Sequence, residues 1–497
     1  MYTLPLHAAT SVVANNALPN FDKVMSGALE KNPVISNNGL TMDITQTSHN
    51  AVIKWNSFDV GGSATVNFWG PDKHNTLNYV NSANMSQIYG TINANNNGNI
   101  FIVNPAGVQI GPSAQINVGS LYVSNSRLSD DALKAVEANN KNFDFNAYMN
   151  NNGTHTDAAL MSLGNINATN VTFEGDGRIV IDSERLINGN NSMGAANINI
   201  KTKADNTGNV IIGYEAYDEE NKKYTVANDT KAVAIVNGTA FNQDDAYMWV
   251  EDVEQLQAID TNLSGNYALR NSIDATATKN WNNNKGFSSI GVDATGKTNG
   301  TGFTGKFDGI DYNIFGLTID RDDETNVGLF GAATDAAINN VTLVGGSING
   351  SSNVGAIVGA AEHTTISNVT NSAKVEGDNN VGGIVGIADN TTVENAINTG
   401  IVDAAGYNIG GLIGYMNNSN LGGNSYNLGD VSGTEAVGGL VGHAVNSAIG
   451  NPSVVNGKPV ENVQVVYNRL NVKGAYNVGG IVGNMKGTTV QNAENSG

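Results

Sequence analysis

The glycine-rich phrase "NVGGIVG" at residues 380–386 is the first candidate for chemistry, because glycine-rich loops can cradle a phosphate. A phosphate loop occurs once, after a strand and before a helix. This phrase instead has the pattern GGxxG, belongs to a set of six copies, and is followed by no helical periodicity in any of them. The spacing therefore predicts a structural repeat and not a nucleotide site.

Other residue types that perform catalysis are present without the spacing that catalysis needs. The six histidines are scattered without an HExxH pair, no GxSxG phrase occurs, and no cysteine is available for a thiol enzyme. The acidic phrase "DRDDE" could bind calcium, but it lacks the signature of a calcium loop. Its carboxylates belong to Asp320, Asp322, Asp323 and Glu324. We therefore predict a non-enzymatic chain with no catalytic residue, no cofactor and no metal site.

Composition and charge limit the class of protein and its partners. The chain has 497 residues, of which 40% are apolar, so it can bury a substantial core. Its net charge of −20 would repel a nucleic-acid backbone. It has no cysteine and no run of about 18 apolar residues that could cross a bilayer as a helix. These features suit an exported protein, and we interpret the opening "MYTLPLHAAT" as the tail of a signal peptide, with a plain chain start as the alternative.

The glycine phrase also marks the elements that build the second half of the chain. The first apolar residues of the six copies are separated by 27, 27, 28, 28 and 41 residues. They are Val327, Val354, Val381, Ile409, Val437 and Val478. A unit of about 30 residues with short strands cannot bury its own apolar face, so each unit must stack on its neighbours as one coil of a β-solenoid.

Such a solenoid assigns a role to each type of repeat residue. Val381 and Ile384 should point inward, and equivalent asparagines should stack as hydrogen-bonded ladders in the turns. Gly382, Gly383 and Gly386 should allow corners that a side chain would block. The step of 41 residues, around "NPSVVNGKPVENVQ", predicts one insertion on a turn.

These repeats resemble the GLUG repeat, a module of bacterial surface proteins that occurs in adhesins and in non-catalytic parts of IgA-cleaving metallopeptidases. The segment before them, from "EDVEQLQAID" to "FTGKFDGIDYNIFGLTID", resembles the lead-in of such arrays. The likeness covers residues 249–497 and rests on the repetition. Because the last copy stops at "NAENSG", where earlier copies continue into a further strand, we expect the natural protein to extend further.

The first half carries a second set of phrases in short alternating strands, such as "ATVNF" and "NIFIV". Four of them follow one another over about 80 residues, at Trp55–Phe58, Leu77–Val80, Ser86–Gly90 and Asn104–Gly111. Their order and spacing resemble the two-partner-secretion domain of filamentous-haemagglutinin-type exoproteins, in which W-x-S/F, LN-x-V, SQI-x-G and NPNGI-x-x-G phrases occur in this sequence. The resemblance implies export by a dedicated outer-membrane transporter, whose periplasmic domains recognise the chain.

We place the candidate recognition residues in "SANMSQI" and "NPAGV", which lie about one coil apart. They are Asn84, Ser86, Gln87, Asn104, Pro105 and Gly107. The family's NPNGI is NPAGV here, so Ala106 replaces an asparagine, and any recognition by that missing side chain is in doubt. The turn itself is retained, because asparagine caps it, proline fixes φ and glycine accepts a positive φ. The alternative, that these residues only shape a corner of the β-helix, stays open.

Two stretches interrupt the strands. The phrase "SRLSDDALKAVEANNKNF" predicts a helix with Ser129 as N-cap and Asp130 and Asp131 in its first turn. The phrase "YEAYDEENKKYTVANDT" is polar and acidic and predicts a surface loop or hairpin.

The fold class that we predict is all-β, a right-handed parallel β-helix (β-solenoid) with small helical and hairpin excursions. We expect a secretion domain at 1–240, a connecting β-helix segment at 241–325 and a GLUG-repeat solenoid at 326–497, truncated at its C-terminal end. The predicted function is a secreted adhesin on the surface of a Gram-negative cell, or its N-terminal part, with a protein or glycan receptor that the sequence does not identify. The stalk of a contact-dependent toxin and the non-catalytic scaffold of a secreted peptidase are the alternatives, and a nuclease-like or HExxH-bearing tail would favour them.

Overall fold

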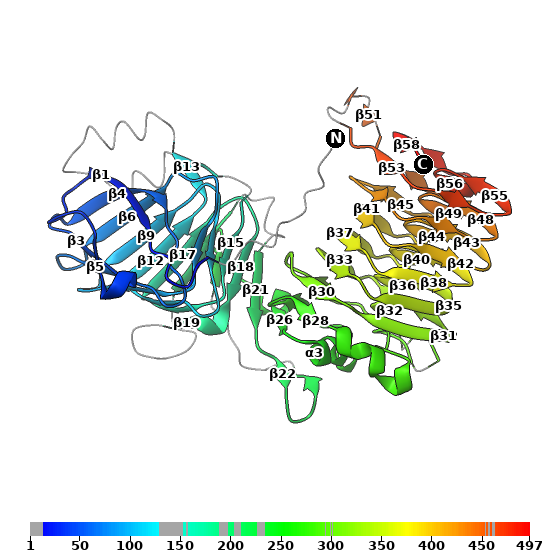
Figure 1. Cartoon of the computed structure of the whole chain (residues 1–497), viewed down its shortest axis with the longest axis horizontal. Coiled ribbons are helices and arrows are strands. Elements are labelled where there is room, and N and C mark those ends of the chain that lie inside the picture. Colours follow the sequence, from blue (N-terminus) through cyan, green and yellow to red (C-terminus); the bar gives the residue numbers. More distant parts are fainter. Residues whose placement is uncertain are drawn as a thin grey trace. The chain divides into compact units, whose positions relative to one another are not determined.

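Short strands separated by tight turns form most of the computed structural model of the chain. The structure describes residues 13–128, 153–155, 158–187, 197–202, 210–225, 234–293, 295–298, 300, 302–452, 454–455, 458–459 and 463–497. Contacts divide the chain into two compact units, one of residues 1–215 and 228–246 and the other of residues 216–227 and 247–497. Parallel strands dominate both units (Figure 1).

The first unit is a parallel β-helix with three sheets along its length. A nine-stranded sheet contains β1 (Asn20–Ser26), β4 (Asn50–Ser57), β6 (Asn75–Val80), β9 (Asn99–Val103), β12 (Ser120–Ser124), β17 (Asn170–Glu174), β20 (Asn197–Lys201), β24 (Ala234–Val236) and β25 (Thr239–Ala240). A seven-stranded sheet contains β2 (Val34–Ser36), β3 (Thr41–Thr45), β5 (Thr65–Trp69), β8 (Thr91–Ala94), β11 (Gln115–Asn117), β16 (Asn165–Asn167) and β19 (Leu186–Ile187). The third sheet pairs β7 (Ser86–Ile88), β10 (Val108–Ile110), β15 (Leu160–Ser162), β18 (Ile179–Asp182) and β21 (Val210–Tyr214).

Alternation along each strand builds the core of this unit. Successive side chains of a strand point to opposite faces of its sheet. In β5, Val66 and Phe68 are buried, while Thr65, Asn67 and Trp69 face outward. Parallel pairing without a shift places Val66 opposite Ile92 on the next coil, so the inward residues form apolar columns. At the first coil, β1 pairs antiparallel with β4 and β2 pairs antiparallel with β3, which covers strand edges that would otherwise be open.

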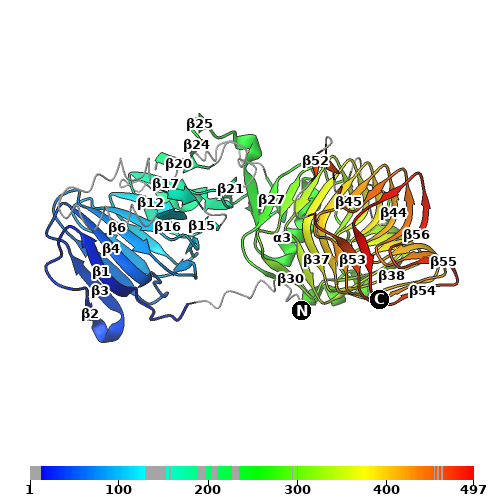
Figure 2. The same cartoon turned by 90° about the horizontal axis from the view of Figure 1, so that it is seen from above.

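The second unit stacks its coils in the same way (Figure 2). A ten-stranded sheet contains β31 (Thr318–Val327), β35 (Ser347–Gly355), β38 (Lys374–Gly377), β39 (Asn379–Gly382), β42 (Val402–Ala404), β43 (Tyr407–Gly410), β47 (Val431–Ser432), β48 (Glu435–Gly438), β54 (Val472–Lys473) and β55 (Tyr476–Gly479). A six-stranded sheet contains β32 (Phe330–Thr334), β36 (Val358–Glu362), β40 (Val385–Asp389), β44 (Ile413–Asn417), β49 (Val441–Val445) and β56 (Val482–Lys486).

The remaining strands of this unit line a third side. They are β26 (Tyr247–Val250), β27 (Tyr267–Leu269), β28 (Ile273–Asp274), β29 (Lys306–Asp308), β30 (Asn313–Phe315), β33 (Ala337–Asn339), β34 (Thr342–Val344), β37 (Thr365–Asn371), β41 (Thr392–Asn398), β45 (Asn420–Gly422), β46 (Tyr426–Asn427), β50 (Ala448–Ile449), β53 (Val466–Asn468), β57 (Thr489–Val490) and β58 (Ala493–Asn495). A short helix, α3 (Val253–Gln257), begins at Asp252, whose carboxylate accepts a hydrogen bond from the backbone N–H of Gln255.

The register of the repeats follows the glycine phrase. The strand pairings align Val327, Val354, Val381, Ile409, Val437 and Val478 on successive coils. The longer step before the last copy contains a hairpin of β51 (Val454–Val455) and β52 (Lys458–Pro459), and the pairing of Val437 with Val478 is kept across it. The insertion on a turn is therefore confirmed.

Asparagine ladders run along the turns, as the repeats predict. In one ladder, Nδ2 of each asparagine donates to Oδ1 of the asparagine one coil earlier, at 2.8 Å, through Asn326, Asn353, Asn380 and Asn408. Their φ angles lie between 53° and 61°, a left-handed conformation that asparagine tolerates. A second ladder, buried except for its last member Asn495, has N–O distances of 2.8–3.0 Å and consists of Asn371, Asn398, Asn427, Asn468 and Asn495.

Glycine is needed at these repeat positions because atoms of the neighbouring coils lie too close for a side chain, and not because the backbone has a positive φ. None of Gly382, Gly383 and Gly386 has a positive φ, and the left-handed position of the repeat belongs to Asn380. A Cβ atom at Gly383 would lie 2.3 Å from a carbonyl oxygen of the next coil and 2.4 Å from Cγ of Asn398. A side chain is therefore blocked at this corner, as the sequence predicts.

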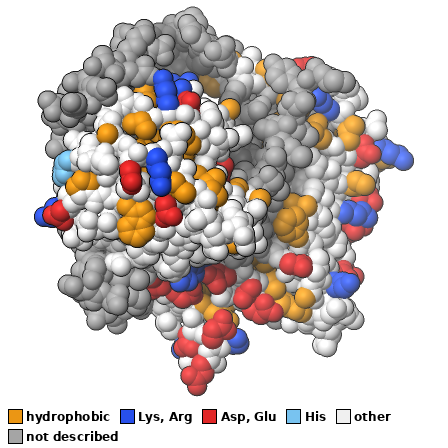
Figure 3. Space-filling model, turned by 60° about the vertical axis from the view of Figure 1, so that its left-hand side comes forward, with side chains coloured by type: hydrophobic (Ala, Val, Ile, Leu, Met, Phe, Trp, Pro, Cys, Tyr) orange, Lys and Arg blue, Asp and Glu red, His pale blue; other side chains and the backbone are white. Residues whose placement is uncertain are grey.

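The predicted fold class, an all-β right-handed parallel β-helix with small excursions, is confirmed. The acidic stretch forms a hairpin of β22 (Tyr217–Asp218) and β23 (Lys223–Tyr224), with acidic side chains gathered on it at the bottom of Figure 3. A further hairpin pairs β13 (Ser126–Leu128) with β14 (Gly153–His155). The helix predicted from Ser129 and the opening ten residues lie outside the described residues.

Candidate transporter-recognition site

The phrase "NPAGV" forms a tight turn between β9 and β10. The backbone N–H of Gly107 donates to the carbonyl oxygen of Asn104 over 2.9 Å, and φ at Gly107 is +99°. Oδ1 of Asn104 accepts a hydrogen bond from the backbone N–H of Ala106, also at 2.9 Å. The asparagine cap and the glycine with positive φ are therefore confirmed as the makers of this turn.

The side chain of Asn104 joins this turn to the phrase "SANMSQI" on the preceding coil. Its Nδ2 donates to the backbone carbonyl of Asn84 and to Oγ of Ser86, each at 3.0 Å. The backbone N–H of Ser86 donates in return to the carbonyl of Gly107, at 3.0 Å. Strand β7 pairs in parallel with β10, with Ser86 opposite Val108. The two phrases thus lie on neighbouring coils, as expected from their separation.

Burial divides the six candidate residues into two groups. Asn104 and Ser86 are 0% and 1% exposed, and Pro105 and Gly107 are also buried. Only Asn84 is exposed, while Gln87 is half-buried. In the folded chain, a partner can therefore contact Asn84 and part of Gln87 directly, but not the side chains that hold the two turns together.

Gln87 already has partners within its own unit. Its Oε1 accepts a hydrogen bond from the backbone N–H of Val13 at 3.1 Å, so it anchors the N-terminal segment to the coil. Its backbone N–H donates to Oδ1 of Asp59 at 2.9 Å. Burial raises the pKa of the Asp59 carboxyl, and this hydrogen bond from Gln87 opposes the shift.

A family model described as the TPS secretion domain matches residues 23–302, which is more than half of the chain. The chain belongs to this family. It is therefore a two-partner-secretion exoprotein, and the four phrases from Trp55 to Gly111 lie within its TPS domain.

Two curated relatives share part of this chain. Halomucin of Haloquadratum walsbyi is 36% identical over 182 residues, which cover 34% of this chain and 2% of that protein. The heme/hemopexin-binding protein of Haemophilus influenzae is 34% identical over 126 residues, which cover 25% of this chain and 13% of that protein. The chain thus spans a small fraction of the length of either relative.

Two solved structures show distant likenesses. The secretion domain of HMW1 from Haemophilus influenzae covers 95% of this chain and is itself covered completely, at 13% identity and a TM-score of 0.25. A putative immunoglobulin A1 protease from Bacteroides ovatus covers 48% of this chain, with 85% of its own chain, at 15% identity and a TM-score of 0.31.

Sequence reasoning missed a second set of buried polar contacts in the TPS domain. Nε1 of Trp55 donates to Oδ1 of Asn78 at 3.0 Å, and Nδ2 of Asn78 donates to the carbonyl of Phe101 at 3.1 Å. Trp55 and Asn78 are both fully buried. The signal was present, because each residue belongs to a family phrase, but neither the contact nor the burial follows from the phrases alone.

The ring of His74 packs between Gly70 and Gly98. A Cβ atom at Gly70 or Gly98 would lie 2.6 or 2.2 Å from its ring, so both glycines make room for it. Its Nδ1 lies 3.0 Å from the carbonyl of Pro71, and its Nε2 has no partner among the described residues. Burial lowers the pKa of His74, which favours the neutral ring.

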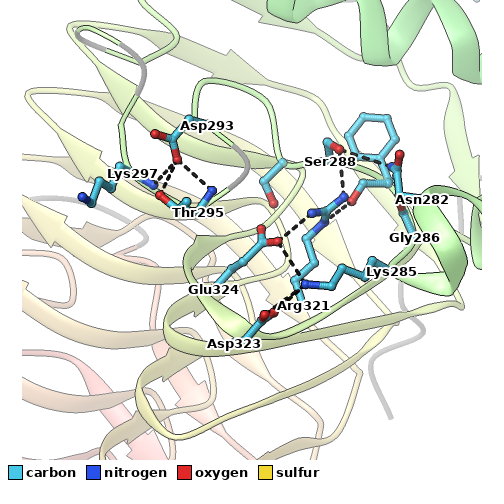
Figure 4. A network of polar contacts seen from close by, with 12 residues as sticks. Asn282, Lys285, Gly286, Ser288, Asp293, Thr295, Lys297, Arg321, Asp323 and Glu324 are labelled. Carbon is cyan, nitrogen blue, oxygen red and sulfur yellow. Dashed lines mark hydrogen bonds and ion pairs between the residues drawn. The ribbon is translucent and has the colours of Figure 1, made fainter.

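Figure 4 shows two carboxylates of the "DRDDE" phrase, those of Asp323 and Glu324, each beside a cationic side chain. Glu324 accepts a hydrogen bond from Arg321 at 2.8 Å, and both side chains are buried. Asp323 accepts two hydrogen bonds from Nζ of Lys285, at 2.9 and 3.0 Å, and that contact lowers the pKa of Asp323. Asp320 accepts one from Asn349 at 2.9 Å. Cationic neighbours thus neutralise two of these carboxylates.

Across the described part of the chain, no group of three or more histidine and acidic side chains is placed to hold a metal ion. Nor does that part contain a helix long and apolar enough to span a membrane.

Proposed function

We propose that this chain is a non-enzymatic cell-surface adhesin, or the N-terminal part of one, exported by a dedicated outer-membrane transporter that recognises "SANMSQI" and "NPAGV". The observation that carries the proposal is the order and spacing of the two family phrases, which lie one coil apart in the chain and are joined in the folded state by the contact of Asn104 with Asn84 and Ser86. Family membership supports the export route. The transporter's periplasmic domains are the partner.

Recognition takes place before these coils close. Asn104, Ser86 and Pro105 are buried in the folded TPS domain, so their side chains are available to a partner only in an extended chain. An extended segment can bind by adding a strand to an open sheet edge of the periplasmic domains. Closure of the coils then withdraws the phrases from the transporter. Each new coil can dock on the one before it as the chain emerges.

The repeat array supports the adhesin role. Its coils span 27 or 28 residues, except for the last step of 41 residues, and they keep one register from Val327 to Val478 and resemble GLUG repeats. A regular stack of this kind lengthens by about 4.8 Å with each coil and repeats the same outer surface along its length. Its corner glycines and asparagine ladders serve packing between coils.

The export proposal is tested by secretion of three variants from cells that carry the partner transporter. Asn104→Ala removes a side chain that the transporter can contact only in the extended chain, and Asn84→Ala removes the candidate side chain that stays exposed after folding. Asn398→Ala is the matched control, because Asn398 is equally buried and hydrogen-bonded but lies outside both phrases. We expect secretion to fall with Asn104→Ala and to persist with Asn398→Ala. Equal loss with both would mean that Asn104 acts only through folding.

The adhesin proposal is tested separately by attachment. Cells that export the chain are compared with cells lacking it for adhesion to epithelial cells and to other bacteria. We expect adhesion to depend on the exported chain. Unchanged adhesion to every surface would overturn this part of the proposal and leave the export route intact.

A further inference from the structure

One outer face of the TPS domain is regular, hydrogen-bonding and almost uncharged. It lies on the seven-stranded sheet, where the inward residues of β3, β5 and β8 are apolar and the outward residues form two columns. We call this surface, together with one aromatic side chain at its side, the Trp69 face. It consists of Thr41, Thr65, Thr91, Asp43, Asn67, Asn93, Asn117 and Trp69.

Trp69 exposes a large part of its side chain on this face, although tryptophan is highly buried on average. Its side chain is 44% exposed, whereas Trp55 and Trp249 are fully buried. Nε1 of Trp69 donates to Oδ1 of Asp43 at 2.9 Å. This hydrogen bond fixes the edge of the indole ring, so the ring offers its apolar surface in one orientation and loses little entropy when a ligand covers it.

The amides beside Trp69 form a ladder with unused hydrogen-bonding capacity. Nδ2 of Asn67 donates to Asp43, that of Asn93 to Asn67 and that of Asn117 to Asn93, each at 3.0 Å. An asparagine amide has two N–H donors and two lone pairs, so each of these links leaves a second donor and a second acceptor. Coils lie about 4.8 Å apart, and the face therefore presents alternating donors and acceptors at that interval.

The charge of the molecule limits the chemical class of the ligand further. The chain carries a net charge of −20, but Asp43 is the only charged residue among those of the Trp69 face. An anionic polymer would be repelled by the molecule as a whole, and a cationic one would find a single carboxylate, already bonded to Trp69 and Asn67. The face suits a neutral ligand with an apolar surface and closely spaced hydroxyl groups.

We infer that the Trp69 face binds a neutral polysaccharide, with the face of one sugar ring stacked on Trp69 and hydroxyl groups of its neighbours bonded to Asn67 and Asn93. This inference rests on the proposed adhesin function and names its receptor class. Sugar hydroxyls donate and accept at once, and sugar rings carry apolar C–H faces. The ladder and the indole ring supply the complementary groups.

The test uses the full chain on an array of neutral and charged oligosaccharides that includes cellohexaose, laminarihexaose and mannohexaose. The strongest neutral binder is then titrated while tryptophan fluorescence is recorded, since Trp69 is the most exposed of the tryptophans in the described chain. Trp69→Ala should weaken binding about tenfold or more, and Trp69→Tyr should retain most of it. Tyr407→Ala, which removes an exposed aromatic side chain from the other unit, should have no effect.

Three results would overturn the inference. The first is an array without a neutral ligand, and the second is equal affinity for wild type and Trp69→Ala. The third is binding that 0.5 M salt abolishes, because salt at that concentration screens charges beyond a few ångströms and the loss would indicate an ionic partner. Cell attachment separates this inference from the adhesin proposal. If Trp69→Ala is exported and cells adhere as with wild type, the Trp69 face is not the adhesive site and the adhesin proposal stands. If wild type supports no adhesion, the adhesin proposal fails, and sugar binding still decides the role of the face.

Discussion

Trp55 and Asn78 are hydrogen-bonded to each other across two neighbouring coils, with 3.0 Å between Nε1 and Oδ1, and both are completely buried. The contact joins two family phrases in the same way as Asn104 joins two others. Each of the four phrases that mark the TPS domain therefore contributes one buried side chain that hydrogen-bonds to a neighbouring coil. These side chains are Trp55, Asn78, Ser86 and Asn104.

The first prediction concerns this pair. Asn78→Ala leaves the buried indole N–H of Trp55 without its acceptor and removes one hydrogen bond to the carbonyl of Phe101, which should lower the unfolding free energy by about 2–4 kcal/mol. Trp55→Phe removes the donor as well as part of the ring. Urea denaturation of both single variants and the double variant measures the coupling. We expect a coupling on the order of 1 kcal/mol, and strict additivity would show that the hydrogen bond contributes nothing.

A second prediction uses the copy of the repeat that has alanine where the ladder has asparagine. Ala436 has φ of +52° at the position where Asn353, Asn380 and Asn408 continue the ladder. Ala436→Asn should relieve the left-handed strain and restore a link to Asn408, raising the unfolding free energy by about 1 kcal/mol. Ala436→Gly is the control that relieves strain without adding an amide. A melting temperature that rises no further for asparagine than for glycine would show that the ladder is not stabilising.

A third prediction tests the corner glycines. Gly383→Val should destabilise the repeat array by about 1–3 kcal/mol or more, because its Cβ would collide with backbone of the next coil. Gly422→Ala is the matched control, since a Cβ there would approach only a side-chain oxygen, at 3.1 Å. Thermal unfolding compares the two. An unchanged melting temperature for Gly383→Val would contradict the packing role, and nucleotide binding by wild type would revive the phosphate-loop interpretation.

The fourth prediction concerns pH. Burial raises the pKa of Asp260 from 3.8 to about 6, although hydrogen bonds from Gly291 and Gln257 oppose the shift. A raised pKa means that the folded state holds the proton more tightly than the unfolded state. The contribution to stability is therefore fully present below pH 3.8 and is lost as the pH rises through about 6.

The corresponding measurement compares wild type with Asp260→Asn, which cannot titrate. Their difference in unfolding free energy should shift against wild type by on the order of 2 kcal/mol between pH 4 and pH 7. Other titrating groups are common to both proteins and cancel in the difference. A difference that does not change with pH would show that Asp260 ionises normally.

The sequence predicted the regular parts of this molecule better than its contacts. Repeated spacing determines register, so the inward column from Val327 to Val478 and the ladder through Asn380 could be anticipated. The proximity of "SANMSQI" to "NPAGV" followed from the same spacing. Each of these features is set by a period, and a period is visible in a single chain.

Burial and distant partners could not be anticipated in this way. Asn104 is a polar turn residue, and only the packed coils show that it is enclosed. Gln87 bonds to Val13, 74 residues away, and Lys285 neutralises Asp323 from a loop outside the repeats. Such contacts depend on how excursions fold back on the coils, which no local pattern encodes.

Binding of the transporter's periplasmic domains to the whole chain in two states tests the central claim most directly. Wild type is offered once folded and once held unfolded in urea that leaves the periplasmic domains intact, and affinity is measured in both. We predict binding to the unfolded chain that weakens about tenfold or more with Asn104→Ala, and little binding to the folded chain. Equal or tighter binding to the folded chain, insensitive to Asn104→Ala, would contradict recognition of these phrases before the coils close.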